Sequence, residues 1–205
     1  MRMTYASAAA MVALASSTHA ANFDGFYVGA QVGHDSTDIK VSENWSPATY
    51  DGFSATGADY GVYAGYGHTF DSHLHLGLEV EGNLSTADNT ITTATDTLKT
   101  EKEHAYGAAL RAGYVADTVM PYVRVGYTSA KFKQALSGTL SASGDETESG
   151  LAYGAGLEWA LSDRIAARAE FVRTAYGKIR QTDGTNTITY DPTETVARVG
   201  VSVRF

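Results

Sequence analysis

The most regular feature of this sequence is a two-residue period in which apolar and polar side chains alternate. Every second residue from 197 to 205 is apolar, and the residues between them are Arg, Gly or Ser. Such alternation is typical of a β-strand with one apolar and one polar face. Seven further segments show the same pattern, and they begin at Phe26, Tyr60, Leu74, Tyr106, Pro121, Leu151 and Ile165. The chain is therefore predicted to form eight strands.

The lengths of the connections between these segments alternate as well. The short connections are 70–74, 116–120 and 161–165, and the long polar ones are 35–57, 85–103, 131–149 and 177–193. Short turns at one end and long loops at the other are the arrangement of outer-membrane β-barrels. No segment after residue 20 approaches the ~20 continuous apolar residues of a membrane helix. These observations predict an all-β fold, an eight-stranded antiparallel transmembrane β-barrel with up-and-down meander order.

The composition of the polar face decides which face points inward. It combines Gly with Glu and Arg, which suits the crowded interior of a small barrel. A shift of one residue would turn Arg111, Arg168 and Arg198 toward lipid, where each costs ~2–4 kcal/mol near the midplane. The charged face is therefore predicted to line the lumen as a structural ion-pair network. Its members are Glu79, Glu81, Arg111, Arg124, Glu158, Arg168, Glu170, Arg198 and Arg204.

The first twenty residues have a different organisation. Arg2 is followed by an apolar run at 8–15, and the small residues Thr18 and Ala20 precede Ala21. This anatomy predicts a cleaved secretory signal peptide, which is too short to span a bilayer. The domains expected are thus a signal peptide at 1–20 and an outer-membrane barrel at 21–205. Export places the protein in the cell outer membrane.

Charge and cysteine content exclude other classes of function. The formal net charge is -8, which argues against nucleic acid as a partner. Cysteine is absent, so disulfides and thiolate metal sites are excluded. No cofactor motif is present, and neither a cofactor nor a catalytic residue is expected.

Three stretches resemble a known family of small surface barrels. They are the mature start at 22–33, the segment at 168–177 and the terminal stretch at 196–205, which ends on Phe. These stretches are similar to those of the opacity-type, OmpA/OmpX-like outer-membrane β-barrels, a group often labelled "porin family". The resemblance implies a surface antigen, and it implies a C-terminal assembly signal for the barrel assembly machinery at Val199, Val201, Val203 and Phe205. One departure is Val172 followed by Arg173, where the family more usually carries a polar residue and then an aromatic one.

Several polar residues outside the expected network have alternative interpretations. His73 and His75 would share a face if extended and could bind a metal ion, and His34 with Ser36 could belong to a lipid-modifying barrel enzyme. Lys131, Lys133 and Arg173 fall on the lipid-facing phase near the loops, where they could meet lipopolysaccharide phosphates or simply solvate the loop bases.

The sequence favours a non-enzymatic surface barrel that supports envelope integrity and displays its loops for interaction. The partners expected are outer-membrane lipids and lipopolysaccharide, the assembly machinery, and host or phage surface ligands. A narrow channel or transporter for small solutes is the main alternative, and a lipid-modifying enzyme is a third. An eight-stranded lumen is wide enough only for its own side chains, which disfavours a porin channel.

Overall fold

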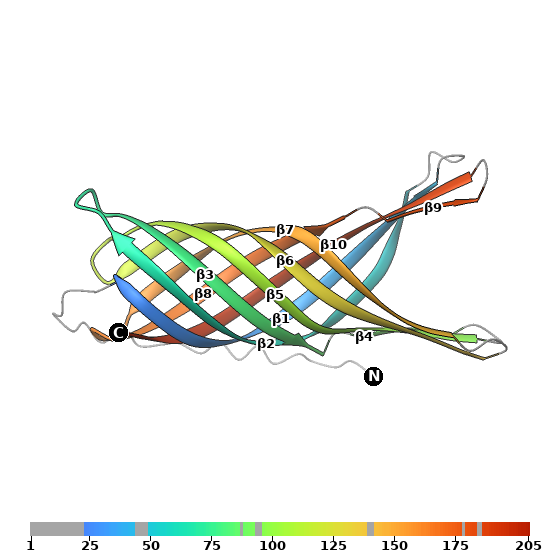
Figure 1. Ribbon diagram of the computed structural model, residues 1–205, viewed down its shortest axis with the longest axis horizontal. Coiled ribbons are helices and arrows are strands. Elements are labelled where there is room, and N and C mark those ends of the chain that lie inside the picture. Colours follow the sequence, from blue (N-terminus) through green and yellow to red (C-terminus); the bar gives the residue numbers. More distant parts are fainter. Residues whose placement is uncertain are drawn as a thin grey trace, which may run out of the picture.

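The computed structural model is a closed antiparallel sheet rolled into a barrel with strongly tilted strands (Figure 1). It describes residues 23–43, 49–86, 88–92, 96–138, 142–177, 179–183 and 186–205. The predicted signal peptide, 1–20, lies outside these residues. The strands are β1 Gly25–Glu43, β2 Thr49–Thr69, β3 Leu74–Ser85, β4 Asp88–Thr92, β5 Asp96–Tyr114, β6 Val119–Gly138, β7 Ala142–Ala160, β8 Ile165–Tyr176, β9 Ile179–Asp183 and β10 Asn186–Arg204.

Eight of the described strands form the wall, each paired antiparallel with the next along the chain. The barrel closes where β1 pairs with β10, in a register that sets Val28 opposite Val203 and Val32 opposite Val199. The short strands β4 and β9 pair with β5 and β10 and lengthen two hairpins beyond the wall. The predicted eight-stranded, up-and-down barrel is confirmed. Among the described residues, no helix is long and apolar enough to cross a membrane.

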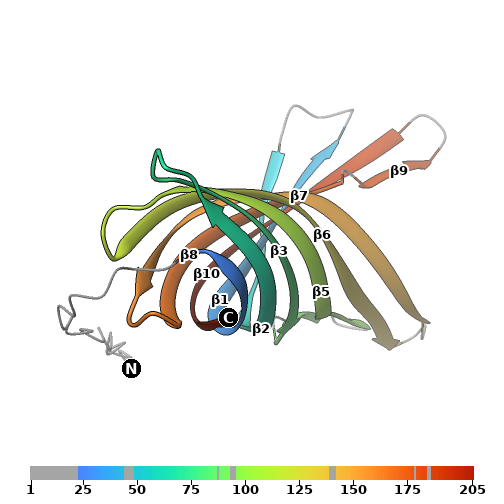
Figure 2. The same cartoon turned by 60° about the vertical axis from the view of Figure 1, so that its left-hand side comes forward.

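The two ends of the barrel differ in their connections (Figures 1 and 2). The tight turns that join β2 to β3, β5 to β6 and β7 to β8 lie at one end, together with the C-terminus. His73 and Asp117 occupy two of these turns in the left-handed region, with φ of 66° and 60°. The other end carries long hairpins. Strand extends into the stretches 35–57 and 131–149 that the sequence predicted as long connections, since β1 continues to Glu43 and β6 to Gly138.

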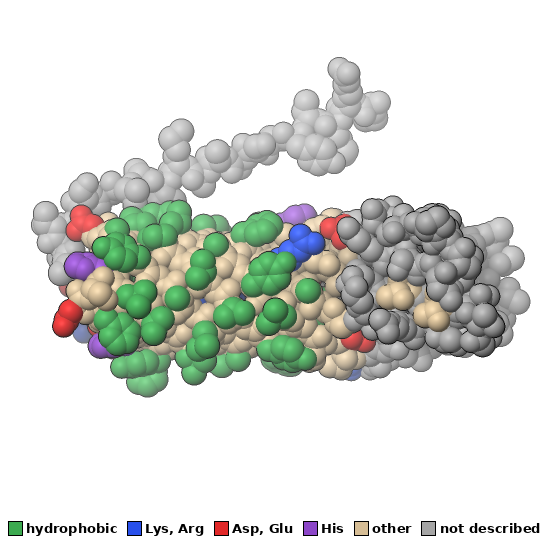
Figure 3. All heavy atoms as spheres, turned by 90° about the horizontal axis from the view of Figure 1, so that it is seen from above, with side chains coloured by type: hydrophobic (Ala, Val, Ile, Leu, Met, Phe, Trp, Pro, Cys, Tyr) green, Lys and Arg blue, Asp and Glu red, His purple; other side chains and the backbone are tan. Residues whose placement is uncertain are grey.

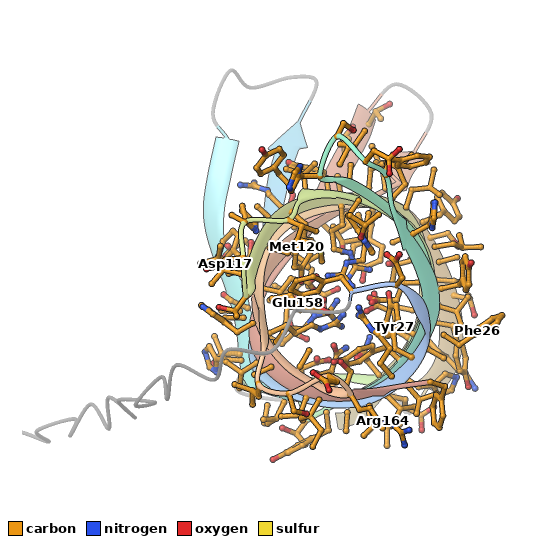
Figure 4. All side chains as sticks on the ribbon, turned by 90° about the vertical axis from the view of Figure 1, so that its left-hand side faces the viewer. Phe26, Tyr27, Asp117, Met120, Glu158 and Arg164 are labelled. Atoms are coloured by element: carbon orange, nitrogen blue, oxygen red, sulfur yellow. The ribbon has the colours of Figure 1, made fainter. Side chains whose placement is uncertain are left out.

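The alternation of side chains follows the predicted phase. Apolar residues at positions such as Phe26, Leu78 and Val201 are exposed on the outer surface, and Figure 3 shows hydrophobic side chains spread over the described part of the wall. A view along the barrel shows Tyr27 and Glu158 inside the ring of strands and Phe26 outside it (Figure 4). This phase also holds at the position that departs from the family pattern, because Val172 is buried and Arg173 is exposed.

Candidate functional site

The nine charged residues expected in the lumen all point inward and come together in one network. They are contributed by β3, β5, β6, β7, β8 and β10, and every one of them is buried. Inward orientation follows directly from the strand period, because each charged residue is flanked along its strand by outward-facing neighbours.

The part of the network nearer the short turns is centred on Glu79 and Glu158. Arg111 donates to Glu158 at 2.6 Å and to Glu79 at 3.3 Å. Arg168 donates to Glu79 at 2.7 Å, and Arg204 donates to Glu158 at 3.0 Å. Each carboxylate therefore accepts hydrogen bonds from two guanidinium groups.

The part nearer the long hairpins is centred on Glu81 and Glu170. Arg124 donates to both carboxylates, at 2.9 Å in each case. Arg198 donates to Glu170 at 2.7 Å and to Glu81 at 2.6 Å. An ion pair of 3.7 Å between Arg124 and Glu79 joins the two parts. Close pairing of this kind offsets the desolvation of charges in a closed interior.

Tyrosine and amide side chains complete the network. Tyr27 donates to Glu79 at 2.9 Å, and Tyr122 donates to Glu170 at 2.8 Å. Gln31 accepts from Arg168 at 2.5 Å. The Arg168 guanidinium also lies 3.4 Å from the centroid of the Tyr63 ring, a cation–π distance. These residues were not predicted from the sequence, although their inward phase between apolar neighbours was a signal that could have found them.

The lumen is closed by apolar side chains at the end with the short turns. Phe23, which precedes β1, is 2% exposed and packs with Met120 and Tyr122. Next to it, the backbone N–H of Thr69 donates to Asp24 at 2.6 Å and fixes the entry of the chain. This closure was not predicted, because Phe23 lies before the alternating segment.

The other end of the lumen is polar and acidic. Ser85 donates to the carboxylate of Asp35 at 3.0 Å, and the Tyr176 hydroxyl donates to Glu194. Asp59 is buried at the same end. The central network thus lies between an apolar closure and this polar layer.

The histidines that the sequence raised as alternative sites lie in different surroundings. His73 lies in a turn, where its ring stacks 5.9 Å from that of Tyr114, whereas His75 points into the lumen and is hydrogen-bonded with Thr69 at 3.0 Å. They therefore do not share a strand face, and the described residues contain no group of three or more His, Cys, Asp or Glu that could hold a metal ion. His34 lies on the outer surface of β1 with Ser36, while Asp35 between them points inward.

The three basic residues near the loops lie in different surroundings. Lys131 is half-buried, and its ammonium lies 3.9 Å from the Glu103 carboxylate. Lys133 pairs along the backbone with Glu101 and Asp145, and its side chain lies outside the described residues. Arg173 is exposed on β8 between Tyr153 and Thr195.

The C-terminal residues expected to form an assembly signal share the outer surface. Val199, Val201, Val203 and Phe205 are all exposed there, with Phe205 at 80%. The backbone N–H of Phe205 donates to Phe26 at 2.9 Å, so the last residue is attached to the first strand.

A charged, filled interior inside an apolar wall defines a small outer-membrane barrel. The chain belongs to the outer membrane protein beta-barrel domain family, whose model matches residues 6–205. This confirms the family resemblance and the location in the cell outer membrane.

Individual proteins are similar to this chain in sequence or in structure. The chain is 26% identical over 190 residues to the 31 kDa outer-membrane immunogenic protein of Brucella melitensis biotype 1, covering 87% of this chain and 79% of that protein. The protein of the same name from Brucella suis biovar 1 matches with the same values. Among solved structures, Neisserial surface protein A superposes with a TM-score of 0.53 at 21% identity, covering 88% of this chain and 97% of that one, which shows the shared fold.

Proposed function

We propose that this protein is a non-enzymatic surface barrel that conducts no solutes, supports the envelope and presents long hairpins for interaction with other surfaces. The observation that carries this proposal is the lumen itself. Four Glu and five Arg side chains form hydrogen-bonded ion pairs across it, and Phe23 with Met120 closes one end. A solute would have to break several buried ion pairs, each strongly unfavourable to separate.

The hairpins support the second part of the proposal. Strands β5, β6, β7 and β10 have 19 or 20 residues each, whereas a membrane-spanning strand needs ~9–11. The excess projects beyond the apolar wall, where loops carried by a rigid scaffold are suited to binding. The Brucella relatives are named as immunogenic outer-membrane proteins, which accords with exposed hairpins on this chain.

The lumen is tested by conductance of the purified, folded barrel in planar bilayers. We expect no large, stable steps from the unmodified protein. Porin-like steps would reject the closed barrel and favour the channel alternative.

The hairpins are tested in cells with two variants. In one variant, a short Gly-Ser connection takes the place of β4 and the turn that follows it. In the other, a short Gly-Ser connection takes the place of β9 and the turn that follows it. We expect correctly inserted barrels with reduced binding of host cells or phage. A change in a short turn, Ser72→Gly, serves as the control and should leave binding unchanged. Unchanged binding after both hairpin replacements would reject the interaction role.

A further inference from the structure

An apolar hollow lies on the lipid-facing side of the wall where β7, β8, β10 and β1 run side by side. The strand register places Ala155, Phe171 and Ala197 in one row across these strands. Leu157, Ala169, Val199 and Val32 form the next row toward the short turns. Because alanines stand between larger side chains, the surface is hollowed by about 710 Å³.

A polar row borders this hollow on the side of the long hairpins. Arg173 is paired with Tyr153 on β7 and with Thr195 on β10, and Thr195 is paired with Ser36 on β1. Arg173 and Phe171 are two residues apart on the same face of β8, so their Cα atoms are roughly 7 Å apart along the strand. His34 is paired with Ala197, so it continues the row of Ala155, Phe171 and Ala197 onto β1.

The position of Arg173 indicates that its guanidinium contacts an anionic group of a lipid. An arginine on the lipid face is costly near the midplane and tolerated near the interface, which favours headgroup level for this side chain. The guanidinium fork matches the oxygen geometry of a phosphate. Lys131, at the same end of the barrel, differs because it has Glu103 as a neighbour and does not belong to the strands that line this hollow.

We propose that this face binds one molecule of a phosphorylated glycolipid of the outer leaflet, with an acyl chain in the hollow and a phosphate on Arg173. The long hairpins mark the outer side in outer-membrane barrels, so the lipid that reaches this row is lipopolysaccharide. A second copy of the chain fits less well, because a two-fold contact over the hollow would bring two Arg173 side chains together. This site is independent of whether the lumen conducts.

Native mass spectrometry of the full-length folded barrel in detergent tests the site, with purified bis-phosphorylated lipid A as the probe. We expect one bound lipid A, and about tenfold weaker binding by Arg173→Gln, the effect of losing one hydrogen bond to a charged group. Filling the hollow with Ala155→Leu and Ala197→Leu should weaken binding similarly. The matched controls, Lys131→Gln and the outward-facing Ala108→Leu, should bind like the unmodified protein.

The choice of lipid provides the second comparison. Dephosphorylated lipid A and phosphatidylglycerol should each bind at least about tenfold more weakly than bis-phosphorylated lipid A. Equal binding of either lipid would overturn the proposal, as would unchanged binding by Arg173→Gln or an equal loss in Lys131→Gln. If the double leucine variant fails to fold, the Arg173→Gln and lipid comparisons still decide the outcome.

Discussion

The ring of Tyr122 lies across Gly156, its partner on the neighbouring strand, so closely that a Cβ atom at position 156 would be 2.6 Å from the ring carbon Cζ. The absence of a side chain at Gly156 therefore lets the ring lie flat along the lumen wall. From there its hydroxyl reaches Glu170. Tyr27 on β1 and its partner Gly65 on β2 show the same relationship, since a Cβ atom at position 65 would be 2.5 Å from Cζ of Tyr27. Inward glycines thus make room for the tyrosines that hold the charged network.

Gly156→Leu should destabilise the barrel by about 1–3 kcal/mol, because the new side chain collides with Tyr122 and overpacks the lumen. Urea unfolding in detergent micelles, followed by Trp fluorescence, measures the difference. The neighbouring Ala155→Leu is the matched control, since Ala155 faces outward and lipid or detergent accommodates its shape. Equal stability of the two variants would contradict the close contact between Tyr122 and Gly156.

Arg111→Met should lower the free energy of unfolding by about 3 kcal/mol, because two buried carboxylates, Glu79 and Glu158, lose a counter-charge. Adding Glu158→Gln should restore part of the loss, since the amide removes one uncompensated charge and can still accept from Arg204. The same urea titration compares the single and double variants. Strictly additive losses would argue that Arg111 and Glu158 are not coupled.

The period-two pattern predicted the barrel and the inward phase of the charged residues, because strand geometry ties side-chain direction to sequence parity. It could not predict which groups pair. Arg168 donates to Glu79 from 89 residues away, and such contacts depend on barrel diameter and strand register. Alternation alone fixes neither quantity.

Two other features escaped prediction for local reasons. Phe23 closes the lumen, yet it precedes the first alternating segment and so carries no periodic signal. The long loops were predicted from their Thr- and Ser-rich composition, whereas the backbone of 35–43 and 131–138 continues as strand. There the cross-strand pairing within each hairpin overrides the weak apolar pattern.

Phe23→Ala should open the end of the lumen at the short turns and cost up to about 3 kcal/mol, since a buried ring is removed from its contact with Met120 and Tyr122. Tyr27 points into the lumen. The hydrogen exchange of its backbone amide, followed by NMR, should speed up if water enters. Phe26→Ala is the control, because Phe26 is outward and exposed. Identical exchange in both variants would show that Phe23 does not seal the barrel.

The long hairpins should face the outside of the cell and the short turns the periplasm, as in other outer-membrane barrels. Single cysteines at Thr90 in β4 and Thr182 in β9 should react with a membrane-impermeant maleimide on intact cells. A cysteine at Ser72, in a short turn, should react only after the outer membrane is permeabilised. The chain contains no other cysteine, so each label reports one site. Labelling of Ser72→Cys alone on intact cells would invert the topology.

Phe205→Ala should lower the amount of assembled barrel in cells far more than it lowers the stability of the folded protein. The ring is exposed, and the bond that attaches residue 205 to Phe26 uses the backbone N–H, which the substitution keeps. The folded state therefore loses little, while the exposed row of Val199, Val201, Val203 and Phe205 loses the terminal residue that we expect the assembly machinery to read. The heat-modifiable gel migration of the barrel in outer-membrane fractions measures the yield of assembled protein. Refolding of the purified protein into detergent measures the stability of the folded state. Phe26→Ala, another exposed aromatic on the same rim, should leave both unchanged. If Phe205→Ala refolds as poorly in detergent as it assembles in cells, its role is in the folded barrel and the assembly signal is rejected.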